Sequence, residues 1–315
     1  MHDKKIIAVV GATGAQGGGL VRAILDDPDG EFGVRVLSRD VQSGQVQALA
    51  RRGAETAAAD LDDGPGLERA LQGAYGAFFV TFYWAHGSPE REQAQAGNMA
   101  RAARGAGIRH AVWSTLEDTR HWIPLDDPRM PTLMGQYKVP HFDAKGASDR
   151  FFRSAGVPTT FLLTSFFWEN FITLDLGPQR GPDGGLVLTL PMGDAKLPGI
   201  AARDIGRCAL GIFRQGERHL GRTLGICGDQ LTGAEMALAL TRALGQEVRY
   251  DAVDPAQYRR LGLPGAEELG NMFQFKRDFA DTYCGARSTG TARALNPGLE
   301  TFDAWLARNR ERLPG

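Results

Sequence analysis

The chain has 315 residues, of which 43% are hydrophobic, and a formal net charge of −1. This size and composition fit one large α/β unit, or a main domain with a smaller one, with ample material for a core. The nearly balanced charge excludes a general electrostatic attraction to nucleic acid or to an anionic membrane.

Residues 5–25 place an apolar run, a glycine-rich turn and a helical pattern in immediate succession. Gly11 permits a tight turn, Gly14 lets a diphosphate approach the backbone, and Gly17 lets helix and strand pack closely. The amides at the helix N-terminus then face the negative charge. The stretch therefore predicts a dinucleotide site; the alternative is a glycine-rich turn without a ligand.

Strand and helix patterns alternate through the first half of the chain. This alternation predicts a Rossmann-type, doubly wound parallel sheet whose ligands lie beyond the carboxyl ends of the strands. Strands are expected at 6–10, 34–37, 56–59, 77–81, 108–114 and 158–163, and helices at 20–25, 45–52, 67–71, 90–106 and 141–155.

The pattern changes in two later regions. Residues 116–140 contain four prolines and predict a long loop, of the kind that often acts as a lid. We expect residues 1–165 to form an NADP(H)-binding Rossmann domain, to which segments near 200–228 return. A smaller α/β domain of residues 166–199 and 229–315 would cover the cofactor cleft. The returning segments are expected to contain a helix capped by Asp204 and a strand at 224–227. The smaller domain is expected to contain strands at 186–190 and 248–253, a Thr232–Glu235 capping box and a closing helix with Trp305.

The end of the second strand selects the nicotinamide cofactor. An acid there binds the ribose 2′-hydroxyl of NAD, whereas an arginine binds the 2′-phosphate of NADP. Arg39 stands close to the expected distance after Gly17, and Ser38 can add a hydrogen bond, so we favour NADP(H). In the alternative, Arg39 is a solvated charge and Asp40 holds a ribose hydroxyl. Asp60 is expected either to accept from the adenine amino group or to cap the next helix.

These motifs resemble the NmrA-like family of atypical short-chain dehydrogenases/reductases, and most closely its HSCARG-type NADPH sensor branch. The similarity extends over nearly the whole chain. It rests on VVGATGAQGG near the start, Ser38-Arg39, Gln72-Gly73-Ala74-Tyr75, Val80-Thr81-Phe82-Tyr83-Trp84, the run from His141 to Gly146, Phe167-Trp168-Glu169-Asn170, Leu263-Pro264-Gly265-Ala266 and Asn271-Met272-Phe273.

The resemblance implies a role for each part of the cofactor site. Arg39 would hold the 2′-phosphate, Asp60 and Leu61 would flank adenine, and Thr81 and Phe82 would line the path to the nicotinamide. Lys145 would reach the nicotinamide ribose. The diphosphate would be wrapped by Gly11, Ala12, Thr13, Gly14, Ala15 and Gln16, and the nicotinamide end closed by Phe167, Trp168, Glu169 and Asn170. Two departures from the branch are Thr81-Phe82, where it tends to carry asparagine, and Gly11-Ala12, where it often has two glycines.

Reductases of the broader superfamily use a Tyr-x-x-x-Lys pair, whose spacing places both side chains on one helix face. This chain has His141 and Lys145 at that spacing, so the lysine is present and the phenol is not. Beside Lys145 we expect a mostly neutral imidazole, which is a poorer proton donor. His141 is equally well interpreted as a helix-start residue without a chemical role. Tyr137 or Tyr83 would be a substitute donor, although packing is the simpler role for both.

Two functions follow from these residues. The first is a redox sensor or regulator with weak or no dehydrogenase activity, in which NADP(H) changes the binding of a partner protein. The second is an NADPH-dependent reductase of a quinone-like or aromatic carbonyl or enone substrate. A DNA-binding regulator has no support in charge or motifs, and no clustered metal ligands are found.

Three further expectations concern the environment of the protein. No apolar run is long enough for a membrane span, and MHDKK leads into a strand pattern and not a secretion signal, so we expect a cytoplasmic monomer or homodimer. The three cysteines lack a CxxC pair and are expected to be buried in a reducing compartment. They are Cys208, Cys227 and Cys284.

Overall fold

A parallel seven-stranded sheet is the centre of the computed structural model, which describes residues 4–262 and 264–313. Its strand order is β11-β6-β5-β4-β1-β2-β3, and every neighbouring pair is parallel. The expected Rossmann-type fold is therefore confirmed. The strands are β1 (Lys5–Val9), β2 (Phe32–Ser38), β3 (Glu55–Ala58), β4 (Gly76–Phe79), β5 (His110–Thr115), β6 (Thr159–Leu163) and β11 (Thr223–Gly225).

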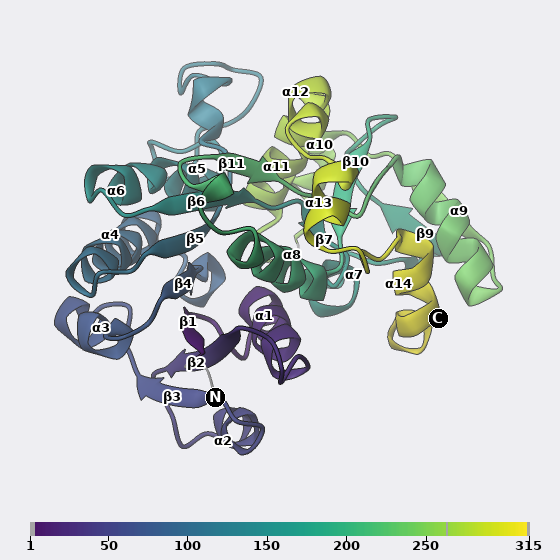
Figure 1. Cartoon of the computed structure of the whole chain (residues 1–315). Helices are drawn as coiled ribbons and strands as arrows, with labels where there is room; N and C mark the ends of the chain where they lie inside the picture. The colour runs from purple at the N-terminus through teal and green to yellow at the C-terminus, as the bar shows by residue number, and fades with distance from the viewer. Residues whose placement is uncertain (1–3, 263, 314–315) are drawn as a thin grey trace.

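Helices cover both faces of this sheet (Figure 1). The central strands β4, β5 and β6 are buried along their whole length, because the crossover helices of a parallel sheet cover both of its faces. Residues of α1 (Ala15–Leu25), α2 (Gly44–Arg51), α8 (Ala202–Arg214) and α13 (Thr289–Leu295) share one apolar core with the sheet. Residues of α3 (Gly64–Leu71), α4 (Pro89–Gly105) and α6 (Asp149–Ser154) share the core on the opposite face.

Glycines bring α1 and α8 into close contact. A Cβ on Gly206 would lie 2.1 Å from the backbone nitrogen of Leu20, and a Cβ on Gly19 would lie 2.5 Å from the carbonyl oxygen of Arg203. The two helices therefore touch backbone to backbone, and α8 holds the start of α1 against the sheet.

The second half of the chain adds two three-stranded sheets and a third apolar core. The strands are ordered β12-β10-β7 and β13-β9-β8. They are β7 (Phe166–Phe167), β8 (Gln179–Arg180), β9 (Leu186–Thr189), β10 (Leu197–Ile200), β12 (Asp229–Leu231) and β13 (Val248–Asp251). The helices are α7 (Asn170–Thr173), α9 (Gly233–Leu244), α10 (Pro255–Tyr258), α11 (Ala266–Asp278), α12 (Ala280–Gly285) and α14 (Phe302–Asn309), of which α9 and α14 lie on the right of Figure 1.

Two sequence expectations about helices were wrong. The helix expected over 141–155 is two helices, α5 (Pro140–Ala147) and α6, because Ser148 separates them and its hydroxyl donates back to the carbonyl of Ala144 at 2.7 Å. Asp204 does not cap α8, which begins two residues earlier; its carboxylate accepts from the backbone nitrogen of Glu300 at 2.9 Å. The capping box of Thr232 and Glu235 is confirmed at the start of α9.

The proline-rich segment 116–140 is irregular, as expected, apart from a short 3₁₀ helix, η2 (Thr119–His121), and one isolated β-bridge. Asp143 of α5 anchors it. One carboxylate oxygen accepts from the nitrogen and hydroxyl of Thr119, and the other accepts from the nitrogens of Lys138 and Val139. Both ends of the segment are therefore attached to the same side chain.

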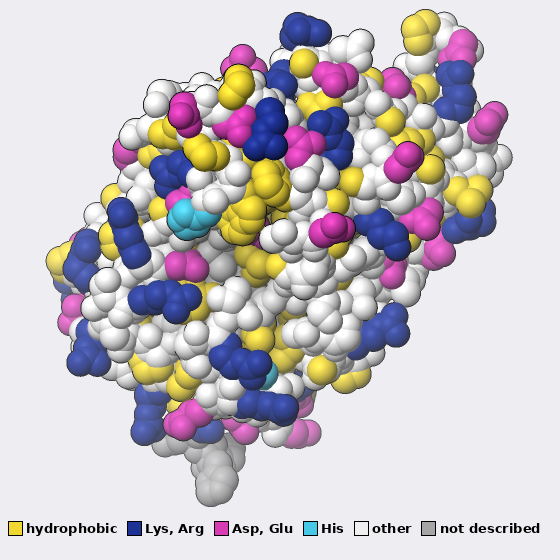
Figure 2. All heavy atoms as spheres, turned by 90° about the horizontal axis from the view of Figure 1, so that it is seen from above, with side chains coloured by type: hydrophobic (Ala, Val, Ile, Leu, Met, Phe, Trp, Pro, Cys, Tyr) yellow, Lys and Arg dark blue, Asp and Glu magenta, His cyan; other side chains and the backbone are white. Residues whose placement is uncertain are grey.

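The surface seen from above carries charges of both signs around hydrophobic side chains (Figure 2). Within residues 4–262 and 264–313, no helix has the length and apolarity needed to cross a membrane. Of the three cysteines, Cys208 and Cys227 are buried as expected, whereas Cys284 is partly exposed. Leu263, which carries part of the family resemblance, lies outside the described residues.

Candidate cofactor site

The glycine-rich turn between β1 and α1 has the backbone geometry that the sequence requires. Gly11 has a φ of +68°, which favours glycine, and its carbonyl accepts from the nitrogen of Gly14 at 2.9 Å. A Cβ on Gly17 would lie 2.5 Å from the Gly11 oxygen, so only glycine allows α1 to start this close to the turn. The tight turn and the close packing are confirmed, and a diphosphate on this turn stays a prediction.

Arg39 and Asp60 lie beside one surface hollow, although they follow different strands. Arg39 follows β2 and Asp60 comes two residues after β3, and parallel pairing brings these strand ends together. The hollow has a volume of about 530 Å³. It is lined by Arg39, Ala58, Ala59, Asp60, Asp63, Gly66, Arg69 and Ala70.

The alternative role of Asp60 as a helix cap was wrong. The N-cap of α3 is Asp63, whose carboxylate accepts from the nitrogen of Gly66 at 3.1 Å. The carboxylate of Asp60 instead accepts from the nitrogen of Asp62 at 3.0 Å, within its own turn. Leu61 packs partly buried against the α3–α4 core.

The other polar side chains after β2 make local turn contacts. The hydroxyl of Ser38 donates to the carbonyl of Asp40 at 3.0 Å, and the carboxylate of Asp40 accepts from the nitrogen of Gln42 at 2.9 Å. Two cations line the hollow, Arg39 and Arg69, and Arg69 lies 3.9 Å from the carboxylate of Asp63.

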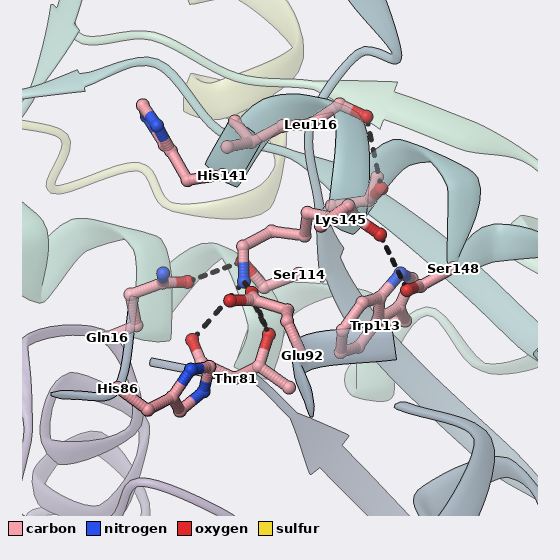
Figure 3. Close-up of polar contacts among 12 residues, drawn as sticks. Gln16, Thr81, His86, Glu92, Trp113, Ser114, Leu116, His141, Lys145 and Ser148 are labelled. Atoms are coloured by element: carbon pink, nitrogen blue, oxygen red, sulfur yellow. Dashed lines mark hydrogen bonds and ion pairs between the residues drawn. The ribbon is translucent and has the colours of Figure 1, made fainter. Parts of the chain in front are cut away.

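Lys145 of α5 sits at the centre of a buried polar group beyond the carboxyl end of β4 (Figure 3). Its amino group donates to Glu92 Oε1 at 2.7 Å, to Thr81 Oγ1 at 2.6 Å and to the Thr81 carbonyl at 3.2 Å. The Thr81 hydroxyl in turn donates to Glu92 Oε1 at 2.5 Å. Because an ammonium has three donors, Lys145 is fully hydrogen-bonded by protein groups.

The surroundings of Lys145 join it to the glycine-rich turn. The amino group lies 5.5 Å from the centroid of the Trp113 ring, and the next residue of β5, Ser114, donates from its hydroxyl to the side-chain oxygen of Gln16 at 2.8 Å (Figure 3). The indole nitrogen of Trp113 donates to Asp149 at 3.0 Å. Burial of Asp149 raises the pKa of its carboxyl to about 6.

His141 lies one helical turn before Lys145, and its ring turns away from the Lys145–Glu92 group (Figure 3). Its Nδ1 lies 2.5 Å from Glu268 Oε1, and its backbone nitrogen donates to the same oxygen at 2.7 Å. The other oxygen of Glu268 accepts from the Tyr83 hydroxyl at 3.2 Å. His141 and Lys145 thus each contact a carboxylate of their own, and the mostly neutral imidazole stays a prediction.

The two tyrosines named as substitute proton donors are held by carboxylates. Tyr137 is buried in the segment 116–140, and its hydroxyl donates to Glu90 Oε1 at 2.9 Å. Burial and the nearby Glu90 raise the pKa of Tyr137 to about 12, and burial with Glu268 raises the pKa of Tyr83. Both phenols are therefore weaker acids than free tyrosine.

The residues expected to close the nicotinamide end have different environments. Trp168 is buried against Phe302, and Glu169 accepts from the Ala202 nitrogen at 2.8 Å and from the Trp305 indole at 2.9 Å. The side chains of Trp168 and Glu169 thus support the third apolar core. Phe167 and Asn170 are partly exposed. Among the aromatics after β4, Phe82 is 67% exposed and Trp84 is 42% exposed.

Comparison with known proteins identifies the family. A model of the NmrA-like family matches residues 3–306. The chain belongs to the NmrA-like family. It is 30% identical over 301 residues to the NmrA-like family domain-containing oxidoreductase FrzB of a Cladobotryum species, covering 88% of this chain and 85% of the relative.

Two solved structures are similar to this NmrA-like chain over nearly its whole length. One is NmrA, a negative transcriptional regulator, in complex with NADP, with a TM-score of 0.78, 24% identity, and coverage of 97% of this chain and 95% of that one. The other is the triphenylmethane reductase of a Citrobacter species complexed with NADP(H), with a TM-score of 0.74, 19% identity, and coverage of 97% and 99%. Both support the same fold.

Sequence reasoning missed three polar residues of this NmrA-like site: Glu92, Ser114 and Glu268. Ser114 could have been found, because it stands at the end of a strand that runs to the ligand edge of the sheet. Glu92 lies in the first turn of α4, where acids are common for reasons of helix stability alone. Glu268 lies 127 residues from His141 along the chain, and no spacing connects the two.

Proposed function

We propose that this NmrA-like chain binds NADP(H) across the carboxyl edge of the seven-stranded sheet. The observation that carries this proposal is the hollow shared by Arg39 and Asp60, with the glycine-rich turn on the neighbouring strand. The residues fit the dinucleotide, because Gly17 lets α1 begin close to the turn with its first amides free for an anion, and Arg39 offers a forked cation for the 2′-phosphate. The NADP complexes of NmrA and triphenylmethane reductase support it.

We further propose that the chain is an NADPH-dependent reductase of a flat aromatic, quinone-like or enone substrate. When bound, the cofactor supplies a hydride. The oxidoreductase name of FrzB and the dye substrate in the name of triphenylmethane reductase support this activity. The exposed rings of Phe82 and Trp84, which follow the carboxyl end of β4, offer an apolar surface for such a substrate.

Each polar side chain of the site has its own role in this proposed reduction. Lys145, held by Glu92 and Thr81, supplies a fixed positive charge beside the nicotinamide ribose position that the family resemblance assigns to it. His141, held by Glu268, supplies an imidazole at the place of the superfamily tyrosine. Ser114 binds Gln16, the second residue of α1, where the proposed diphosphate turn meets this helix.

The second candidate is a redox sensor of the HSCARG type, in which bound NADP(H) alters the surface offered to a regulatory partner. The observation that favours it is Lys145, whose three donors are all taken by Glu92 and Thr81. A ribose hydroxyl would have to displace one of these bonds, so cofactor binding would rearrange the group. The name of NmrA, a negative transcriptional regulator, agrees with this role.

A titration followed by a turnover assay separates these proposals. The purified protein is titrated with NADPH and NADH, with nicotinamide fluorescence as the readout, and is then incubated with NADPH and a panel of quinones, enones and triphenylmethane dyes. Tighter binding of NADPH than of NADH, with oxidation of NADPH, supports the reductase. Tight binding without oxidation by any acceptor supports the sensor, and absence of binding contradicts both.

A further inference from the structure

Glu268 brings a carboxylate from α11, a helix of the third apolar core, to the edge of the proposed cofactor site. It lies in the first turn of α11, which follows Gly265 with a φ of +73°. The side chain is buried, and both of its oxygens accept hydrogen bonds. Oε1 accepts from the backbone nitrogen of His141, and Oε2 accepts from the Tyr83 hydroxyl.

This carboxylate fixes which nitrogen of His141 carries a hydrogen. An ionised carboxylate only accepts hydrogen bonds, so the Nδ1 that lies 2.5 Å from Glu268 Oε1 must be the donor. Nε2 has no hydrogen-bond partner in the part of the chain that the structure describes. The imidazole is thus oriented by one nitrogen and free to exchange a proton at the other.

Two aromatic side chains pack against the imidazole ring of His141 near the protein surface. The ring centroid of His141 lies 5.2 Å from that of Trp84 and 5.8 Å from that of Tyr83. The His141 side chain is 10% exposed, and the partly exposed Trp84 ring packs beside it. The open part of the imidazole therefore reaches the surface next to the aromatic side chains that follow β4.

We infer that Glu268 is a positioning residue that makes His141 the proton donor of the reduction, in place of the missing tyrosine. When a substrate carbonyl is reduced, its oxygen gains a negative charge, and the His141 Nε2–H bond breaks as the new O–H bond forms. Glu268 balances the charge of the imidazolium before this transfer, and the neutral ring then regains a proton from solvent. The inference rests on the proposed reductase activity.

A charge-removing variant separates this role from a structural one. Glu268→Gln keeps a side-chain oxygen that can accept from the His141 backbone nitrogen, but it removes the negative charge. Glu267→Gln, an exposed neighbour in the same turn of α11, makes the same chemical change away from His141. We expect Glu268→Gln to lower kcat about 10- to 100-fold while the Kd for NADPH and the substrate KM change little, and Glu267→Gln to match the wild type.

A spectroscopic readout tests the geometry independently of turnover. In ¹⁵N-histidine NMR spectra, we expect His141 to carry a proton on Nδ1 in the wild type and to lose this preference in Glu268→Gln. An active wild type whose Glu268→Gln variant keeps full kcat, or whose His141 lacks the Nδ1 proton, overturns the inference alone. A wild type that binds NADPH but reduces no acceptor overturns the proposed reductase and the inference with it.

Discussion

Arg39 is the side chain on which the predicted preference for NADP(H) over NAD(H) rests. It follows β2, whose carboxyl end lies next to that of β3 in the parallel sheet, and it lies beside the hollow that Asp60 also lines. A guanidinium at this place matches the geometry of a phosphate, whereas a ribose hydroxyl gains little from it. We therefore expect the choice between NADP(H) and NAD(H) to depend on this residue.

Replacement of Arg39 tests the cofactor preference. We expect Arg39→Ala to weaken NADPH binding about 10- to 100-fold and to leave NADH binding nearly unchanged, since a charge-assisted bond to phosphate contributes about 1.5–3 kcal/mol. Fluorescence titration with both cofactors measures the two Kd values. Arg51→Ala, on the exposed side of α2, serves as the control. An unchanged preference in Arg39→Ala would show that another group recognises the 2′-phosphate.

Glu92 and Lys145 form a buried ion pair. Glu92 has no solvent exposure and Lys145 is nearly buried, so either charge left alone would be desolvated without a partner. We expect Glu92→Gln to lower the free energy of unfolding by about 3 kcal/mol, as is typical when a buried ion pair loses one member. Denaturant unfolding measures this loss. The double variant Glu92→Gln/Lys145→Met should lose less than the sum of the two single variants, and simple additivity would contradict the pairing.

At the scale of elements, the glycines of α1 and α8 control how closely these two helices pack. No periodicity in the sequence distinguishes Gly206 from other helix glycines, because the neighbouring backbone belongs to a helix almost two hundred residues earlier. The sequence does contain the information for the individual elements. Alternating apolar runs and turn residues were enough to place the strands of the parallel sheet within a few residues.

Gly206→Ala tests the contact between α1 and α8. Its Cβ would lie 2.1 Å from the Leu20 nitrogen, so the helices must separate, and we expect a loss of stability of about 2 kcal/mol or more with weaker NADPH binding. Thermal unfolding and cofactor titration measure the two effects. Gly285→Ala in α12 is the matched control, because its Cβ would meet no atom within 4 Å and alanine favours a helix. Equal melting temperatures for the two variants would contradict the close packing.

At the scale of the whole molecule, the second half of the chain has a core of its own that contains a buried cation. The amino group of Lys276 lies 5.4–5.5 Å from the ring centroids of Phe142, Phe166, Phe273 and Tyr283. Burial, together with the smaller effect of the nearby Arg287, lowers the pKa of Lys276 from its ordinary 10.5 to about 7. The folded protein thus holds this proton less tightly than the unfolded chain does.

The sign of the resulting pH dependence follows from proton binding. Between pH 7 and about 10.5 the unfolded chain binds more protons at Lys276, so its contribution makes the folded state more stable as pH rises. We expect Lys276→Met to be more stable than the wild type at pH 7, by up to about 4 kcal/mol, and equal to it near pH 10.5. Denaturant unfolding at several pH values measures the difference, with the exposed Lys196→Met as control. A constant difference across this range would contradict a lowered pKa.

The sequence by itself determined the parallel sheet, the glycine turn with its positive-φ Gly11, and the side chains at the strand ends, including Arg39 and Asp60. These features depend on local backbone preferences and on the rule that parallel strands end at one edge. Only the tertiary structure decided that Ser148 divides the helix after residue 140, that Lys145 binds Glu92, and that His141 binds Glu268. The last two contacts join residues 53 and 127 positions apart in the chain, and no local pattern encodes them. The break at Ser148 is local, but a serine within a helical pattern does not by itself predict one.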